Sequence, residues 1–238
     1  MKKFNQVSRD LDKITAVIKA DENKIKELDN IDQRRAALVA GDREKYEALK
    51  AEFNATEEAR KDLSEKIYIN KIARCYIADN RKVALYNDTI TVIKAVYTKY
   101  NGKPYGEKTR DKIREEIKKL TGCSVWIAAR EVNIYSFSAK GYKDCEVRAI
   151  AEYNNPILTP ENKINAAALD HLTLHINYTE NPKKAARDLA KLHKKTYAAI
   201  EAANKALNDY THAAPGNIKN ALSTNYIINP LYSKINIR

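Results

Sequence analysis

Segment 102–109 (GKPYGEKT) has the general form of a glycine-rich phosphate loop. A Walker loop, however, places its lysine directly after the second glycine and follows a strand. Here Glu107 separates Gly106 from Lys108, and the residues before the loop have a helical pattern. The spacing therefore excludes Walker-type nucleotide hydrolysis.

A weaker anion site remains at the same place. Lys103, Lys108 and Arg110, the basic loop, surround the expected start of a helix at Thr109. Unsatisfied N–H groups at the start of a helix bind phosphate readily. A plain helix cap with exposed lysines accounts for the same residues, so both interpretations stay open.

His171 and His175 are four residues apart and follow Asp170. On one helix this spacing would place both imidazoles on the same face. The surrounding pattern instead indicates a helix-to-strand junction, and no third ligand is evident. The sequence therefore predicts no metal site and no cofactor.

The strongest candidate for binding is a set of basic residues on the predicted helix that opens at Asn181-Pro182. The members of this basic stripe are Lys183, Lys184, Arg187, Lys191, Lys194 and Lys195. Much of the set recurs every four residues, on the side of the helix opposite Leu189 and Ile200. Such a stripe can track phosphates, although a solvated lysine face has the same pattern.

Charge and composition limit the class of protein. The 238 residues carry a formal net charge of +12, which favours anionic partners such as nucleic acid, an acidic protein face or anionic lipid. The chain has three cysteines, Cys75, Cys123 and Cys145. Their odd number and wide spacing predict neither a disulfide framework nor a zinc site. The N-terminus lacks the apolar core of a secretory signal, and no stretch approaches the roughly 18 apolar residues that span a bilayer. We therefore expect a cytoplasmic protein that makes no membrane contact.

These candidates need elements to position them, and the first element is a long helix. Its apolar residues follow alternating steps of three and four, the pattern of a coiled-coil seam. They are Phe4, Val7, Leu11, Ile14, Ile18, Ile25 and Leu28. Asp21 interrupts the series, either as a polar residue that fixes the register or as a solvated flaw.

A turn near residues 39–42 should reverse the chain. Gly41 suits the left-handed position after a helix, and Asp42 suits the N-cap of the next one, with Glu44 near its positive end. So short a connection predicts antiparallel neighbours. The second arm continues to about residue 100, and the phase of its apolar seam slips near residues 67–69, which predicts a stutter, bend or break there.

The second arm is longer than the first, so part of its apolar edge has no cover from the hairpin. This excess seam consists of Val83, Tyr86, Ile90, Ile93, Tyr97 and Tyr100. Either the C-terminal region or a second copy of the chain must bury it. We therefore predict a binding surface for a protein partner at these six residues.

Residues 101–238 have a different pattern. Short helices are expected at 109–120 and 160–170, a long helix from Pro182 to about Thr211, and strands near 123–137, 144–153 and 172–178, with a hairpin turn at 138–141. The predicted fold is mainly α with a smaller α+β part. A long antiparallel helical hairpin of coiled-coil type (1–100) precedes a compact basic α+β domain (101–238).

Segment 36–46 (AALVAGDREKY) resembles the hairpin turns of coiled-coil proteins encoded by bacteriophages, and segment 102–109 resembles parts of such proteins as well. This resemblance implies a protein of a phage or mobile element that acts in a bacterial cytoplasm by binding host or viral machinery. Inhibitors of nucleic-acid-guided defence nucleases are one such group. No functional residue is carried over from it.

No Ser/His/Asp order, activated cysteine or carboxylate pair stands out. We therefore expect a non-enzymatic binding protein that engages nucleic acid or a nucleoprotein complex. If it inhibits a host nuclease, its positive charge means that it holds the guide or target strand, or covers an acidic protein face. The alternatives are a structural coiled-coil protein that forms a homodimer through the excess seam, and an enzyme whose site is assembled only in space.

Overall fold

The computed structural model of the chain describes residues 2–127, 134–139, 146–151, 157–174 and 176–213. Its contacts divide the chain into two compact units, residues 1–186 and residues 187–238. The elements in chain order are α1 (Lys2–Asp29), α2 (Ile31–Val39), α3 (Arg43–Ala55), α4 (Glu57–Lys99), α5 (Glu107–Thr121), β1 (Cys123–Ile127), β2 (Ile134–Ala139), β3 (Glu146–Ala151), the 3-10 helix η1 (Ala166–His171), β4 (Leu172–Thr173) and α6 (Pro182–Ala213). The described chain is thus mainly helical.

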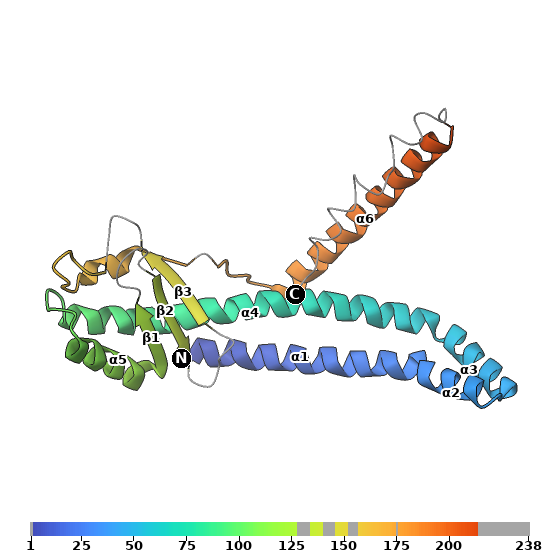
Figure 1. The fold of residues 1–238 in the computed structure, drawn as a ribbon, viewed down its shortest axis with the longest axis horizontal. Helices are drawn as coiled ribbons and strands as arrows, with labels where there is room; N and C mark the ends of the chain where they lie inside the picture. Colours follow the sequence, from blue (N-terminus) through green and yellow to red (C-terminus); the bar gives the residue numbers. More distant parts are fainter. Residues whose placement is uncertain (1, 128–133, 140–145, 152–156, 175, 214–238) are drawn as a thin grey trace. The chain divides into compact units, whose positions relative to one another are not determined.

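The long N-terminal helix pair consists of α1 and α4, which lie antiparallel to each other (Figure 1). The Phe4 amide donates to Oδ2 of Asp88 at 3.0 Å, and farther along Nζ of Lys66 lies 3.0 Å from Oδ1 of Asp21. The predicted seam of α1 faces this pair. Phe4, Leu11, Ile14 and Ile18 are all buried, while Val7, Ile25 and Leu28 are half-buried.

Asp21 decides between the two interpretations of the seam. The residue is 9% exposed, and its carboxylate accepts a hydrogen bond from Lys66 on α4. Glu22 pairs with Lys71 beside it at 2.8 Å. The solvated flaw is therefore wrong, and the buried, paired Asp21 fits a role in fixing the register.

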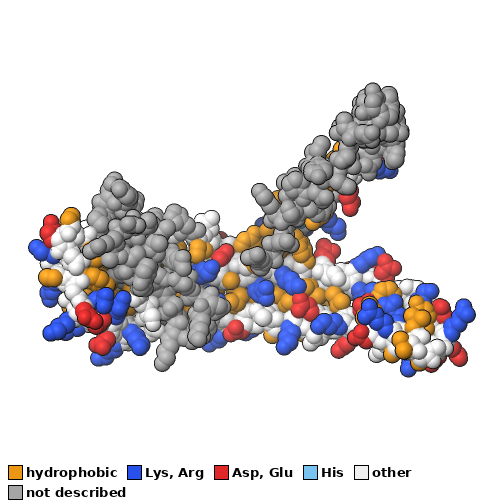
Figure 2. All heavy atoms as spheres, viewed as in Figure 1, with side chains coloured by type: hydrophobic (Ala, Val, Ile, Leu, Met, Phe, Trp, Pro, Cys, Tyr) orange, Lys and Arg blue, Asp and Glu red, His pale blue; other side chains and the backbone are white. Residues whose placement is uncertain are grey.

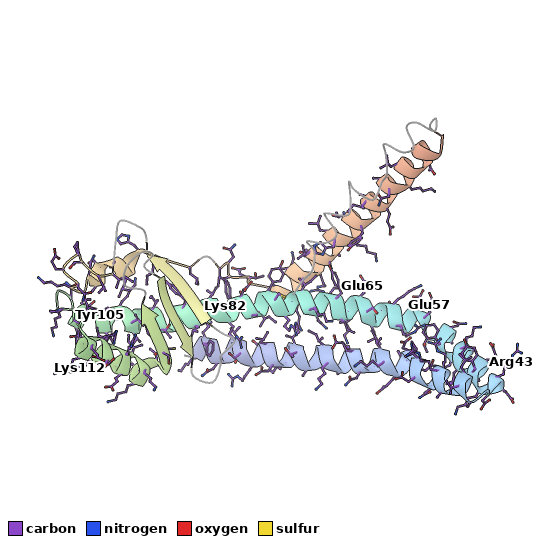
Figure 3. All side chains as sticks on the ribbon, in the orientation of Figure 1. Arg43, Glu57, Glu65, Lys82, Tyr105 and Lys112 are labelled. Carbon is purple, nitrogen blue, oxygen red and sulfur yellow. The ribbon has the colours of Figure 1, made fainter. Side chains whose placement is uncertain are left out.

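The turn at the tip of the hairpin follows the local rules. Gly41 has a φ of 71°, and the amides of Gly41 and Asp42 donate to carbonyls at the end of α2, which closes that helix. Oδ1 of Asp42 accepts from the Lys45 amide at 3.0 Å and caps α3. Both predicted roles are confirmed. Arg43 marks this end of the hairpin in Figure 3, and Tyr105 marks the opposite end.

The arms break where the sequence did not predict it. The first arm breaks at Asn30, which has a positive φ of 41°, and the second breaks at Thr56, whereas α4 runs unbroken through residues 67–69. The two breaks touch across the hairpin. Nδ2 of Asn30 donates to the Leu49 carbonyl at 3.0 Å, and the Thr56 hydroxyl lies 3.4 Å from the Leu28 carbonyl. Of the three alternatives predicted for residues 67–69, the helix break is therefore wrong, while the stutter and the bend stay predictions.

An aromatic ring stabilises this joint. The guanidinium groups of Arg34 and Arg60 lie over the Phe53 ring, 4.1 and 3.4 Å from its centroid. Both cations also lie within 4 Å of the Asp29 carboxylate, at 3.8 and 3.7 Å. Cation–π contacts contribute about 0.5–2 kcal/mol each. The outer hairpin, α2 and α3, is thus tied to the inner one by a cluster drawn from both arms.

The elements after α4 form a sheet, a helix and a short 3-10 turn. The four strands lie in the order β1-β2-β3-β4, with each neighbouring pair antiparallel. Instead of the predicted helix at 160–170, residues 158 and 164 form an isolated bridge, Asn162 adopts a positive φ of 59°, and only η1 is helical in this range. The predicted strand at 172–178 shortens to the two residues of β4. Residues 138 and 139 of the predicted hairpin turn belong to β2 instead, and residues 140–141 lie outside the described residues.

One hydrophobic core joins one end of the helix pair, where α1 begins and α4 approaches its end, to these later elements. Phe4 of α1 and Ile93 of α4 share it with Ile113 of α5 and Leu169 of η1, each at most 1% exposed. The core therefore crosses the predicted boundary between residues 100 and 101. Whether 1–100 and 101–238 fold separately stays a prediction.

The surface of the hairpin carries both signs of charge, with basic and acidic side chains interspersed along it (Figure 2). Ion pairs connect its arms, such as Lys71 with Glu22, and lie along single helices, such as Lys61 with Glu57. Among the described residues, no helix combines the length and the apolar character that crossing a bilayer requires.

Candidate functional site

The basic stripe lies on a single continuous helix. Pro182 opens α6, and Oδ1 of Asn181 accepts from the Lys184 amide at 3.0 Å, so the predicted helix start is confirmed. All six side chains of the stripe are exposed, while Ala186 between them is buried. From residue 183 to residue 195 the stripe extends about 18 Å along the helix axis. A helix face of this kind can bind several successive phosphates of one polymer.

The residues just before α6 are held to α4 by one side-chain amide. Nδ2 of Asn80 donates to the Thr179 carbonyl at 2.7 Å, and Oδ1 of Asn80 accepts from the Thr179 amide, also at 2.7 Å. Asn80 is only 5% exposed, so both bonds are shielded from water. Next to this clamp, Nζ of Lys3 lies 5.3 Å from the centroid of the Tyr178 ring. The start of the basic helix therefore has a defined attachment to the helix pair.

Asn80→Ala should release this attachment. The substitution leaves the Thr179 amide and carbonyl without their partner, which costs about 1–3 kcal/mol. Asn70→Ala is a matched control, because Asn70 lies on the same helix and gains the same helix propensity. We expect a lower free energy of unfolding in urea and faster hydrogen exchange at Thr179 for Asn80→Ala alone. Equal stability of the two variants would contradict a structural role for the clamp.

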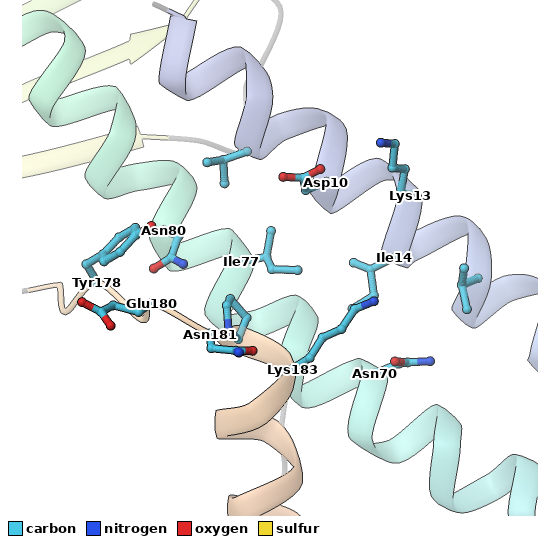
Figure 4. A pocket seen from close by; sticks show the side chains of 13 residues that line it. Asp10, Lys13, Ile14, Asn70, Ile77, Asn80, Tyr178, Glu180, Asn181 and Lys183 are labelled. Atoms are coloured by element: carbon cyan, nitrogen blue, oxygen red, sulfur yellow. The ribbon is translucent and has the colours of Figure 1, made fainter.

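A groove of about 440 Å³ lies beside the clamp, between α1, α4 and the residues that lead into α6 (Figure 4). Its charged lining is balanced, with Asp10 and Glu180 against Lys13 and Lys183. Ile77 is buried at its floor. A balanced, mixed lining does not select anions or cations, so the groove adds no ligand class to the basic stripe.

The basic loop lies at the other end of α4. Gly106 starts α5 without a side-chain cap, and Lys108 is exposed beside it. Nζ of Lys103 lies 5.0 Å from the centroid of the Tyr100 ring, and Arg110 is half-buried, with Nε 4.0 Å from the Asp111 carboxylate. The loop follows a helix rather than a strand, which agrees with the exclusion of a Walker loop.

The structure does not bring the basic loop and the start of the basic stripe together. Lys183 follows the segment that Asn80 clamps, whereas Lys103 follows the end of α4 at Tyr100. Twenty residues of helix separate these two points of α4, about 30 Å. The basic loop and the start of the basic stripe are therefore separate surfaces.

The excess seam is buried inside the chain. Ile90, Ile93 and Tyr97 are 8%, 0% and 1% exposed, and Tyr86 and Tyr100 pack against the same core. The Tyr86 hydroxyl also donates to the Leu172 carbonyl at 3.1 Å. Val83 is half-buried. The sequence left two candidates to bury the excess seam, the C-terminal region and a second copy of the chain. The later part of the same chain buries it, so a second copy is not needed for these residues.

The residues considered for chemistry lie apart. His171 is exposed at the end of η1, and His175 lies outside the described residues. Asp170 lies 2.9 Å from Nζ of Lys94, and this hydrogen bond lowers the pKa of its carboxyl group. Cys123 is buried, and burial raises the pKa of its thiol, the opposite of an activated nucleophile. In the part of the chain that the structure describes, no three His, Cys, Asp or Glu residues cluster as metal ligands would.

Sequence reasoning missed Asn80 and the joint around Phe53. Asp79 is half-buried beside Lys82, whereas its neighbour Asn80 is buried. In the sequence, the one sign that Asn80 has a structural role is that a polar residue stands next to an apolar seam. Its partner is 99 residues away, and no local rule identifies such a partner.

Comparisons with protein-family models, with curated proteins and with solved structures found no match to this chain.

Proposed function

We propose that this chain is a non-enzymatic binding protein that holds a nucleic acid, alone or within a nucleoprotein complex, through the basic stripe of α6. The observation that carries the proposal is the exposure of all six basic side chains on one helix. The net charge of +12 adds long-range attraction toward a polyanion. In this proposal the helix pair and its core serve as the support to which Asn80 attaches the residues just before α6.

Arg187 and the five lysines suit phosphate contacts rather than base reading. Basic side chains contact phosphates whatever the sequence, whereas reading base edges needs groups placed in a groove. The proposed binding is therefore tolerant of sequence, and the basic loop near Lys108 is a second, weaker contact. That residues 101–238 act as one compact α+β domain is also part of this proposal.

A titration with salt tests the proposal. If the six side chains of the stripe each neutralise a phosphate of a 20-base-pair DNA duplex, the logarithm of the affinity should fall against log salt with a slope of about −5. Between 50 and 200 mM salt the affinity should then drop by about 10³-fold. Fluorescence anisotropy with labelled duplex DNA, duplex RNA and single strands of equal length measures these slopes. An affinity that is flat over this range for every probe would refute the proposal.

Inhibition of a nucleic-acid-guided nuclease of a bacterial host is a narrower expectation that depends on the resemblance of segments 36–46 and 102–109. If the stripe binds a guide or target strand, the same anisotropy titration with an RNA–DNA heteroduplex should give the tightest binding. The heteroduplex is therefore one of the probes.

The second candidate function is a structural homodimer, which the apolar face of α6 opposite the basic stripe favours.

A further inference from the structure

The face of α6 opposite the basic stripe follows a heptad pattern, with the polar residues His193 and Thr196 at two of its positions. Its residues recur in alternating steps of three and four over three heptads, which is typical of a helix that pairs with another helix. In positions a and d they are Leu189, His193, Thr196, Ile200, Ala203 and Leu207, after Ala186, which begins the series and is already buried within the chain. All lie within α6.

The positions that flank this face, e and g, carry no charged side chain between residues 187 and 207. Every charged side chain between residues 187 and 207 falls at position b, c or f: Arg187, Asp188, Lys191, Lys194, Lys195, Glu201 and Lys205. The e and g positions hold Ala190, Leu192, Tyr197, Ala199, Asn204 and Ala206. Two of these are large and exposed, Leu192 at 58% and Tyr197 at 40%. Because e and g charges normally select the partner, their absence lets two identical helices meet without like-charge contact.

The described helices α1, α4 and α5 already pack their apolar faces within the chain. The seam of α1 packs on α4, the excess seam lies in the core, and Ile113 and Ile117 of α5 are both 0% exposed. Past residue 213 the sequence continues with Pro215 and Gly216 and has no heptad pattern. The helix that best fits a neutral heptad face of this length is α6 itself, in a second copy.

We propose that α6 pairs with α6 of a second copy through this face, in antiparallel orientation. Charge decides the orientation. Residues 183–195 contain six basic residues and one acidic residue, a net charge of +5, whereas residues 196–213 contain Lys205 with Glu201 and Asp209, a net charge of −1. Antiparallel pairing places each basic half beside the weakly acidic half of its neighbour, and parallel pairing would bring the two basic halves together. The basic stripes then remain on the outside, at opposite ends of the pair.

The mass of the full chain in solution tests this interface. After nuclease treatment and a high-salt wash, light scattering should give twice the 27.1 kDa of one chain. Ile200→Asp places a charge in the face, while Ala202→Asp places the same charge two residues away at position c, where the side chain is exposed. We expect Ile200→Asp to weaken dimerisation at least tenfold and Ala202→Asp to leave it unchanged, with equal helicity by circular dichroism.

Three outcomes would overturn the interface. A monomer throughout the micromolar range is the first, and a dimer that Ile200→Asp does not weaken is the second. The third is a monomer that dimerises only when residues 214–238 are deleted, which would assign the face to the chain's own C-terminal segment. A monomer that sediments with vesicles of phosphatidylserine and phosphatidylcholine would instead identify a lipid surface as the occupant. Because no nucleic acid is present, none of these results bears on the salt slope of the basic stripe.

Discussion

Replacing all six residues of the basic stripe by glutamine is expected to abolish binding to duplex DNA, with the salt slope falling from about −5 toward zero. Each lost phosphate contact should reduce the slope by about one, because one fewer counterion is released on binding. Non-specific affinity for DNA comes almost wholly from phosphate contacts, so the glutamine variant should bind little DNA at protein concentrations below the millimolar range. Anisotropy at three salt concentrations measures both quantities.

The chain offers a closely matched control. Five lysines and one arginine on the helix pair and its tip are equally exposed: Lys13, Lys19, Lys24, Lys26, Lys45 and Arg35. Glutamine at these six positions lowers the net charge from +12 to +6, as the stripe variant does. We expect the control to keep the slope near −5. If both variants lose affinity equally, overall charge and not the stripe would explain binding.

Ile93→Ala is expected to lower the free energy of unfolding by about 2–5 kcal/mol, the usual cost of truncating a fully buried isoleucine. Ile93 is 0% exposed in the core that joins the helix pair to α5, β1 and η1. The loss should therefore destabilise both sides of residue 100 together. Val39→Ala at the hairpin tip, where Val39 is 90% exposed, should change stability by less than about 0.5 kcal/mol.

Two probes follow the unfolding in urea. Circular dichroism reports the helices, and fluorescence of the single tryptophan, Trp126 in β1, reports on the sheet. Coincident transitions that shift together in Ile93→Ala would show one cooperative unit. Separate transitions, with only one shifted, would instead support the predicted division into 1–100 and 101–238.

Local rules predicted the elements whose causes are local. The seam from Phe4 to Leu28 needed only apolar spacing, and Gly41 and Asp42 needed only the chemistry of helix ends. The start of α6 followed from Asn181 and Pro182 in the same way. In each case the decisive partners lie within about one helical turn or repeat along one helix.

The sequence could not predict features that depend on partners distant in the chain. The break at Asn30 is stabilised by the Leu49 carbonyl, 19 residues away, and Asn80 holds Thr179, 99 residues away. The excess seam was recognised as needing cover, but the identity of that cover depended on how α5 and η1 pack. For the basic stripe, the helix and the exposure could be predicted, and its ligand is proposed.

Phe4 has a consequence for the order of events during synthesis. It is synthesised 168 residues before Leu172, which belongs to the core that buries it. At 5–20 residues per second, about ten to thirty seconds pass between the two. During that interval the nascent first helix exposes its apolar seam, and a chaperone that recognises such segments should associate with the unfinished chain until residue 172 has emerged.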